Sequence, residues 1–252
     1  MKNYISTSIA FSSIFLCTTS LAGEWEDQQL ALAADMHISA PDLSLQVAEL
    51  SPMITRADTP VFRGSLVENS DAAPLFLERF TSGEDTADIR VALAWVLMDF
   101  ETLPLEFVQS EADETVRAAL LEQYKTAPAE IAVPALNAML EDSSSHVRAQ
   151  AARLAGYQES ADLNEMLILT LSDSSPSVRA LSARSLGWHN ATLAYTAISS
   201  LLDDEVPEVR LRALRALDII DATQTAALPQ LQGLALDRDI TVARKANQIL
   251  SR

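Results

Sequence analysis

A short motif, a β-branched residue followed by arginine, recurs along this chain at a nearly constant interval. Four equally spaced copies end in Arg117, Arg148, Arg179 and Arg210. One further copy ends in Arg90, and in the last copy Ala243 takes the place of the arginine. Self-similarity at a fixed period of about 20–50 residues is the signature of a stacked-repeat architecture. The interval therefore predicts the fold class, and it favours partner binding over chemistry.

Each motif lies between two apolar-periodic stretches that we predict to be helices. The first stretch, helix A, covers residues 131–140, 163–171, 193–202 and 226–236 in successive units. The second, helix B, starts at the motif and is rich in small and apolar residues. Six residues before each arginine position lies an acid: Glu84, Glu111, Asp142, Asp173, Asp204 and Asp237. The predicted unit is helix A, a tight acidic turn, helix B and a short loop.

A pair of short helices cannot bury its apolar face alone, so successive pairs are expected to stack around a continuous core. At about 100° per residue, one side of the second helix carries Val147, Ala151, Leu154 and Ala155. We expect this side to face the core. Gly156 and Gly187 lie where this helix is expected to end, a position that favours glycine because glycine tolerates positive φ.

The pattern resembles the HEAT repeat family, and most closely its phycobilisome-lyase-type HEAT-like branch. The resemblance rests on Val133-Pro134-Ala135-Leu136 and Leu228-Pro229-Gln230-Leu231 in helix A, on the acid, on the Val-Arg motif and on Leu186-Gly187. It is strongest over residues 127–221. It implies an all-α, right-handed α-solenoid, a HEAT-like superhelix of about six helical-hairpin repeats, with helix B lining the concave surface.

The recurring acids and arginines have two interpretations. Six acids in a row suggest catalytic or metal-binding carboxylates, but recurrence in every unit indicates architecture. The acid lies before helix B, where its oxygens accept backbone N–H groups. The resemblance further implies that acid and arginine pair between neighbouring units. We predict a structural ladder of Asp142, Arg148, Asp173, Arg179, Asp204, Arg210 and Asp237.

A second set of arginines shares the period, five residues after the ladder positions. Arg153, Arg184 and Arg215, here called the basic row, are predicted to point away from the core on neighbouring helices, about 10 Å apart. Repeat duplication alone also produces such a row. As a functional feature, the row predicts a site for an acidic or extended segment of a partner protein, because guanidinium groups pair with carboxylates through two bonds. Arg212 extends this site, and Trp95 occupies the equivalent position upstream. Tyr157 and Trp188, at equivalent positions of adjacent units, are expected to cover the edge of the core.

Residues 1–22 have the layout of a secretory signal peptide, with Lys2, an apolar run and Ser20-Leu21-Ala22 before the cleavage point. A membrane anchor and a lipid anchor at Cys17 are the rival interpretations; the apolar run is too short to span, and the residues before Cys17 are too large for lipoprotein processing. We therefore expect an exported protein, periplasmic in a host with two membranes and otherwise secreted. Residues 23–71 are expected to cap the repeat domain of residues 72–252.

The remaining composition excludes several classes of function. A net charge of −17 opposes non-specific binding to nucleic acid or to an anionic membrane, and no insertion into a membrane is expected after cleavage. His37, His146 and His189 lack the spacing of metal ligands, and the motifs of nucleophilic catalysis are missing. We expect no metal and no cofactor. The sequence predicts a non-enzymatic scaffold for protein–protein interaction, with a lyase-type HEAT-repeat enzyme or enzyme subunit as the alternative.

Overall fold

The computed structural model describes residues 73–83, 85–100 and 103–252, which contain helices, turns and loops but no strand. The signal peptide and the cap expected at residues 23–71 lie outside the described residues, as does His37. The chain divides into two compact units, residues 1–100 and residues 101–252, and each is considered by itself.

The first unit contributes one helical hairpin, α5 (Ala73–Ser82) and α6 (Ala87–Phe100). The two helices pack together, and Phe80 of α5 is buried, as are Leu93 and Leu97 of α6. An ion pair between Arg79 Nε and Asp85 Oδ2 at 2.7 Å fixes the turn that joins them.

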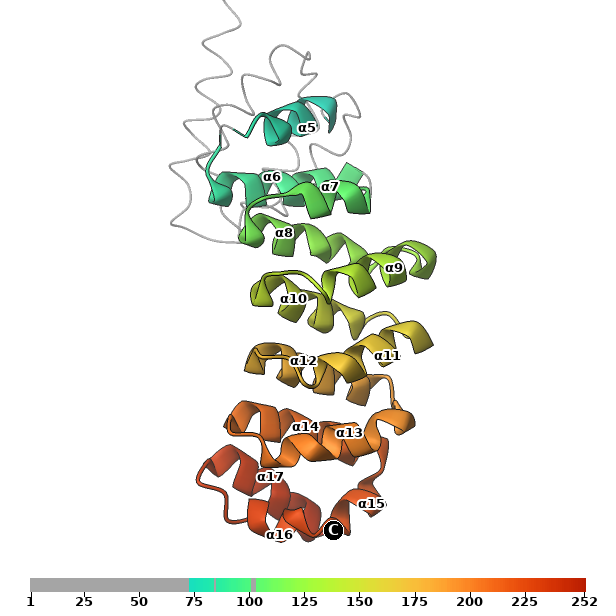
Figure 1. Cartoon of the computed structure of the whole chain (residues 1–252), viewed down its shortest axis with the longest axis vertical. Helices are drawn as coiled ribbons and strands as arrows, with labels where there is room; N and C mark the ends of the chain where they lie inside the picture. Colours follow the sequence, from blue (N-terminus) through green and yellow to red (C-terminus); the bar gives the residue numbers. More distant parts are fainter. Residues whose placement is uncertain (1–72, 84, 101–102) are drawn as a thin grey trace, which may run out of the picture. The chain divides into compact units, whose positions relative to one another are not determined.

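The second unit stacks five further hairpins (Figure 1). The A helices are α7 (Leu105–Ser110), α9 (Ala129–Met139), α11 (Ala161–Thr170), α13 (Tyr195–Ser200) and α16 (Gln230–Leu234), the last preceded by α15 (Ala222–Ala226). The B helices are α8 (Glu114–Leu120), α10 (Ser145–Ala155), α12 (Pro176–Trp188), α14 (Pro207–Ile220) and α17 (Ile240–Leu250). Three 3₁₀ turns complete the unit: η2 (Leu121–Lys125), η3 (Thr192–Ala194) and η4 (Leu201–Asp203).

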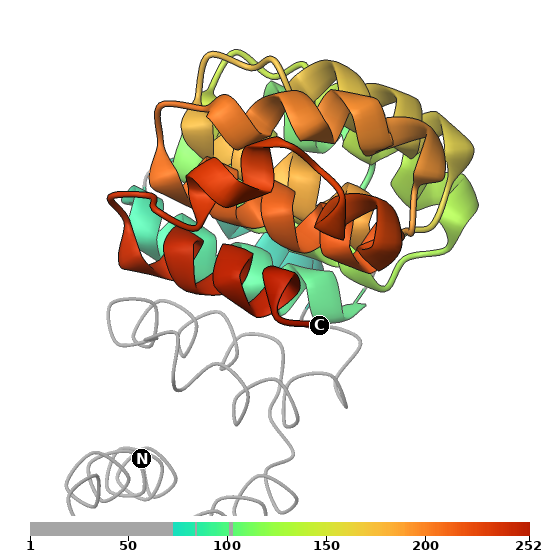
Figure 2. The same cartoon turned by 90° about the horizontal axis from the view of Figure 1, so that it is seen from below.

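Each B helix packs against the next, from α8 through α10, α12 and α14 to α17. Figure 2 looks along this stack, with the C-terminal hairpin nearest to the viewer. With one hairpin in the first unit and five in the second, the predicted all-α solenoid of about six helical hairpins is confirmed for the described residues.

The core lies between the A and B layers and follows the predicted periodicity. Val147, Ala151, Leu154 and Ala155 of α10 are all fully buried. The equivalent Val178 of α12 and Val209 of α14 are buried as well. Alanine at many of these positions leaves room for neighbouring helices to approach closely. The stack therefore buries a continuous apolar layer without a large aromatic centre.

The prediction that Gly156 and Gly187 adopt positive φ is wrong. Gly156 has φ −62° at the end of α10, and Gly187 lies inside α12. Both are required by close packing instead. A Cβ on Gly187 would lie 2.8 Å from the Cα of Ala216 on α14, and one on Gly156 would lie 2.8 Å from the hydroxyl of Ser185. It is Asn190, after α12, that takes a positive φ of 51°.

Helix A is more broken than predicted in the last two repeats. The stretch at residues 193–202 is split among η3, α13 and η4. The stretch at residues 226–236 is interrupted before α16, because Pro229 is the N-cap of that helix. Proline has no N–H to donate, so it is well tolerated at a helix start.

Candidate functional site

Bidentate ion pairs join successive repeats of the second unit. In each, the guanidinium on the B helix of one repeat pairs with a carboxylate of the next repeat. The pairs are Arg117 with Asp142, Arg148 with Asp173, Arg179 with Asp204, and Arg210 with Asp237. For Arg148, Nε donates to Asp173 Oδ2 at 2.7 Å and Nη2 donates to Asp173 Oδ1 at 2.9 Å. We call these four pairs the Asp–Arg ladder; they follow the arrangement that the resemblance implied.

The ladder also closes the turn before each B helix. Nη1 of Arg148 donates to the carbonyl oxygens of Asp142 and Ser143, at 2.9 and 3.1 Å. Asp142 Oδ1 in turn accepts the backbone N–H of Ser144 at 2.8 Å. Each carboxylate thus joins a backbone donor in its own repeat to a guanidinium in the preceding one. These arginine and aspartate side chains already pair with one another and with the backbone, so they are not available to bind a ligand.

The first residue of the basic row, Arg153, is neutralised by a neighbour. Its Nη2 pairs with Glu122 Oε1, and its Nε donates to Gln150 Oε1 at 3.1 Å. Gln150 also donates to Glu122 at 2.7 Å. Glu122 occupies the position of the preceding repeat that is equivalent to Arg153, so the register of the repeat brings the two side by side.

Arg184, in the middle of the basic row, has no ion-pair partner among the described residues. Its guanidinium lies over the ring of Trp188, with Cζ 4.5 Å from the ring centroid. Its Nε and Nη2 are shielded from solvent and make no hydrogen bond within the described part of the chain. Burial lowers the pKa of this guanidinium, and the positive charges of Arg212 and Arg153 lower it further.

The other predicted binding residues differ in their availability. Arg212 forms an exposed pair with Glu208, one turn earlier on α14. Arg215 is exposed, and the described residues offer it no ion-pair partner. Trp95 is half-buried in α6 of the first unit. The structure thus brings Arg184, Arg215 and Arg212 onto neighbouring B helices, and of these only Arg212 has an ion-pair partner among the residues that the structure describes.

An exposed apolar row runs beside the basic row. Tyr157 and Trp188 form an edge-to-face contact with ring centroids 5.8 Å apart, and their residues are 45% and 48% exposed. Ile219 occupies the position of the next repeat that is equivalent to Trp188, and it is 55% exposed. We call these three the apolar row. The sequence alone suggested only that the two aromatic residues cover the core, and Ile219 was missed, although the repeat period points to it.

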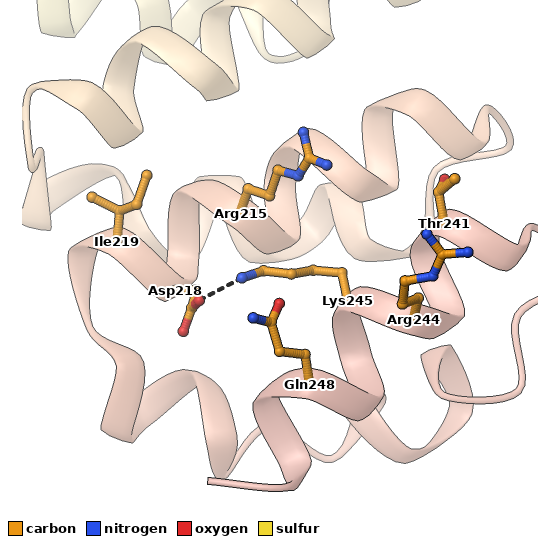
Figure 3. Close-up of a pocket in the computed structure, with 7 residues that line it drawn as sticks. All are labelled: Arg215, Asp218, Ile219, Thr241, Arg244, Lys245 and Gln248. Atoms are coloured by element: carbon orange, nitrogen blue, oxygen red, sulfur yellow. Dashed lines mark hydrogen bonds and ion pairs between the residues drawn. The ribbon is translucent and has the colours of Figure 1, made fainter.

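A pocket of about 350 Å³ lies at the C-terminal end of both rows, between α14 and α17 (Figure 3). Its lining includes Arg215, Asp218 and Ile219 from α14, and Arg244, Lys245 and Gln248 from α17. Lys245 donates to Asp218 at 2.6 Å, and Arg252 reaches the same carboxylate at 2.7 Å. Arg244, like Arg215, is exposed and has no ion-pair partner within the described part of the chain.

Comparison with known proteins agrees with this geometry. A family model described as HEAT repeats matches residues 163–251. The matched residues are similar to HEAT repeats. No curated protein sequence matches the chain.

Several solved structures resemble these HEAT repeats. Escherichia coli YibA is 15% identical, with a TM-score of 0.56, and the match covers 96% of each chain. An engineered protein is 18% identical over 94% of this chain and 76% of its own, with a TM-score of 0.49. Human deoxyhypusine hydroxylase, crystallised with glycerol, is 18% identical over 90% of this chain and 96% of its own, with a TM-score of 0.41. The likeness to YibA concerns the fold alone.

Outside the ladder and the two rows, the HEAT repeats offer few candidate sites. No group of three His, Cys, Asp or Glu side chains suitable for a metal ion occurs in the described residues. His146 lies at the start of α10, whereas His189 follows α12 and contacts Asn164 Oδ1 through Nδ1 at 2.7 Å. None of the described helices is long and apolar enough to cross a membrane.

The ladder carboxylates are held in their charged form. Burial alone would raise the pKa values of Asp142 and Asp204, but hydrogen bonds from Arg117 and Arg179 and from backbone N–H groups outweigh it, and both pKa values are lowered. For Asp173 the hydrogen bond from Arg148 is the largest cause of its lowered pKa. The pKa of Asp237 is lowered in the same way, by Arg210.

These lowered pKa values predict acid unfolding of the HEAT stack. Because the folded state binds protons more weakly than the unfolded chain, the ladder contributes its full stability above the unfolded Asp pKa of about 3.9. That contribution is lost as the pH falls through the lower folded values. We expect the free energy of unfolding, measured by urea titration, to be nearly constant between about pH 5 and 7 and to fall steeply below about pH 4. Stability that rises on acidification below pH 4 would contradict this account.

Proposed function

We propose that this chain is an exported, non-enzymatic HEAT-repeat scaffold that binds an acidic segment of another protein on the exposed face of its B helices. The observation that carries the proposal is the state of Arg184. Its guanidinium is stacked on a half-exposed tryptophan, and two of its nitrogen atoms are shielded from water without an acceptor among the described residues. A partner carboxylate would pair with the guanidinium through its remaining nitrogen, Nη1, which is not among the shielded atoms.

The energetics of Arg184 favour such a ligand. A shielded donor without an acceptor destabilises a folded protein by about 1–3 kcal/mol, and more when the group is charged. Stacking on Trp188 offsets part of this penalty, by about 0.5–2 kcal/mol. A carboxylate that reached the guanidinium would form charge-assisted hydrogen bonds in surroundings already partly free of water. Arginine, tryptophan and tyrosine are also the residue types enriched at the centres of protein interfaces.

The distribution of charge supports an acidic partner. The whole chain carries a net charge of −17, yet Arg184, Arg215 and Arg244 lie on successive B helices with no ion-pair partner in the described residues. A local positive surface on an acidic protein attracts an acidic segment to this face, whereas the remaining surface repels it. Complementarity of this kind raises the association rate and selects the orientation of binding.

The proposal also includes export of the protein and a role without catalysis. Export is supported by the leader-like residues 1–22, and a scaffold role is supported by a HEAT fold whose exposed features are stacking groups and unpaired donors. The alternative, a lyase-type HEAT-repeat enzyme, has no observation among the described residues in its favour. Kinship with the lyase-type branch of the family remains a prediction from the sequence.

Two substitutions of Arg184 separate binding from stability. Arg184→Glu is expected to weaken binding of a fluorescently labelled glutamate-rich peptide by about 10–100-fold, since it removes a charge-assisted contact and adds repulsion. Arg184→Met is expected to weaken binding as well, while raising Tm by about 2–4 °C, because a shielded unpaired charge is replaced by an apolar group. Fluorescence anisotropy and thermal unfolding measure the two effects.

The matched control is Arg238→Glu. Arg238 is an exposed arginine in the turn before α17, with no ion-pair partner in the described part of the chain. Its substitution by glutamate changes the charge by the same amount as Arg184→Glu, but outside the B helices. If Arg184→Glu and Arg238→Glu weaken the peptide equally, general charge accounts for binding and the proposed site is wrong. A loss confined to the Arg184 variants, with the fold intact, supports the site.

A further inference from the structure

The basic row and the apolar row have a common spacing that constrains the shape of a bound segment. Arg184 of α12 and Arg215 of α14 are equivalent positions, and so are Trp188 and Ile219. Packed helices have interaxial distances of about 8–10 Å. The packing of Gly187 against Ala216 shows that α12 and α14 approach each other closely. Neighbouring repeats therefore present one arginine position and one apolar side chain at intervals of about 8–10 Å.

A polyproline II helix has the same spacing. It rises about 3.1 Å per residue with three residues per turn, so residues i and i+3 lie on one side, about 9.3 Å apart. A β-strand, in contrast, places side chains on one face at intervals of about 6.6 Å and about 13 Å, because they alternate about every 3.3 Å. An α-helix places i and i+4 about 6 Å apart and i and i+7 about 10.5 Å apart along its axis. Of these spacings, the interval of about 9.3 Å in polyproline II is the one that lies within the range of about 8–10 Å for packed helices.

The pocket between α14 and α17 begins at Arg215, one repeat after Arg184. Arg215 borders it from α14, and Arg244 borders it from α17 (Figure 3). Lys245 spans part of the pocket toward Asp218, whose charge it neutralises together with Arg252. The side chains of the lining thus have an excess of positive charge, and Ile219 adds an apolar wall. A single carboxylate suits this mixture of charges, whereas the Asp218 carboxylate opposes the dense charge of a nucleic acid or polyphosphate.

We infer that this pocket receives a second carboxylate of the segment bound at Arg184, three residues further along a proline-rich, acidic polyproline II helix. The inference rests on the proposed function, since it concerns the same bound segment. Tyr157, Trp188 and Ile219 pack against the prolines between the acids. Aromatic-lined surfaces bind such segments well, because a polyproline II helix loses little conformational entropy on binding.

The test uses synthetic peptides of one composition and different spacing. The first repeats Glu-Pro-Pro four times. Each peptide contains four glutamates and nine prolines, the first carrying one additional proline at its end. In the others, neighbouring glutamates are separated by two or by four positions where the first has three. With the mature protein, the three-residue spacing is expected to bind at least about tenfold more tightly, since only it places carboxylates at Arg184 and at the pocket together. Fluorescence anisotropy at low and physiological salt gives the affinities.

A variant of the pocket tests its role separately. Arg244→Glu combined with Arg215→Glu is expected to reduce the affinity for the Glu-Pro-Pro peptide to that of its spacing variants, because the second carboxylate loses its site. Arg238→Glu is the control for the reversal of charge. It is expected to retain the preference for three-residue spacing, since Arg238 neither lines the pocket nor pairs with a residue that does.

The outcomes distinguish the two proposals. Equal binding of all peptides, with equal loss in Arg184→Glu, overturns the spacing inference and leaves the proposed function standing. A spacing preference that survives reversal of Arg215 and Arg244 shows that the pocket is not the second site. Binding that Arg184→Glu does not weaken overturns both proposals. A spacing preference that is lost in the pocket variant and kept in the control supports the inference.

Discussion

Replacing Arg179 with methionine is expected to lower the free energy of unfolding by about 3–5 kcal/mol, because it leaves a shielded carboxylate without its partner. Arg179 donates to Asp204 at 2.8 and 3.0 Å, and the two side chains are only 13% and 8% exposed. The same guanidinium donates to the carbonyl oxygen of Asp173 at 2.8 Å. Methionine fills the volume of the arginine stem but satisfies none of these acceptors.

The matched control is an arginine on the next helix with an exposed ion pair. Arg212 pairs with Glu208, and the two side chains are 31% and 53% exposed. Exposed pairs of this kind contribute about 0.3–0.5 kcal/mol on a helix. Arg212→Met is therefore expected to change stability by less than about 1 kcal/mol. Urea unfolding followed by circular dichroism measures both variants, and equal effects would mean that the ladder is no more than a set of surface ion pairs.

A double variant that removes both partners of one ladder ion pair tests the cause of the loss in stability. If most of the loss comes from the abandoned carboxylate, Arg179→Met with Asp204→Leu is expected to recover part of the stability lost in Arg179→Met alone. Recovery is incomplete, because the carbonyl oxygen of Asp173 and the backbone N–H of Val206 still lack the partners that they have in the wild type. A double variant less stable than the sum of the two single losses would contradict this explanation.

The ladder and the basic row could be predicted from the sequence because their residues recur with the repeat period. Residues at one period lie side by side in a stack, so the acids and arginines of neighbouring units were expected to meet. The neutralisation of Arg153 by Glu122 follows from the same register, although the sequence alone did not single out Glu122. The shielding of Arg184 could not be predicted, because it depends on the rotamer that stacks its guanidinium on Trp188.

The pocket and the ends of the helices could not be predicted from the sequence either. Gln248, and not Arg244 or Lys245, occupies the position of the last repeat that is equivalent to Arg215, so the period alone does not place either basic residue beside Arg215. The predicted helix end at glycine is confirmed at Gly156 and is wrong at Gly187. Local sequence favours a helix end at glycine, but whether the helix ends there depends on the neighbouring helix: Gly156 is the C-cap of α10, whereas α12 continues to Trp188.

Gly187→Ala is expected to destabilise the protein by about 2 kcal/mol, although alanine is the better helix former. The new Cβ would lie 2.8 Å from both the Cα and the Cβ of Ala216, so the backbones of α12 and α14 must move apart. Overpacking of this kind destabilises by about 1–3 kcal/mol, which exceeds the gain of about 1 kcal/mol in helix propensity. Thermal and urea unfolding give the size of the loss.

Gly233→Ala is the control, since it makes the same chemical change inside α16 with no atom within 4 Å of the new Cβ. It is expected to stabilise the protein by about 0.5–1 kcal/mol, so the two variants differ in sign. Adding Ala216→Gly to Gly187→Ala removes one of the two close contacts and is expected to restore part of the loss. Separation of α12 from α14 also lengthens the interval between Arg184 and Arg215. If that interval selects the bound segment, Gly187→Ala must reduce the preference for glutamates at three-residue spacing, and Gly233→Ala must leave it unchanged.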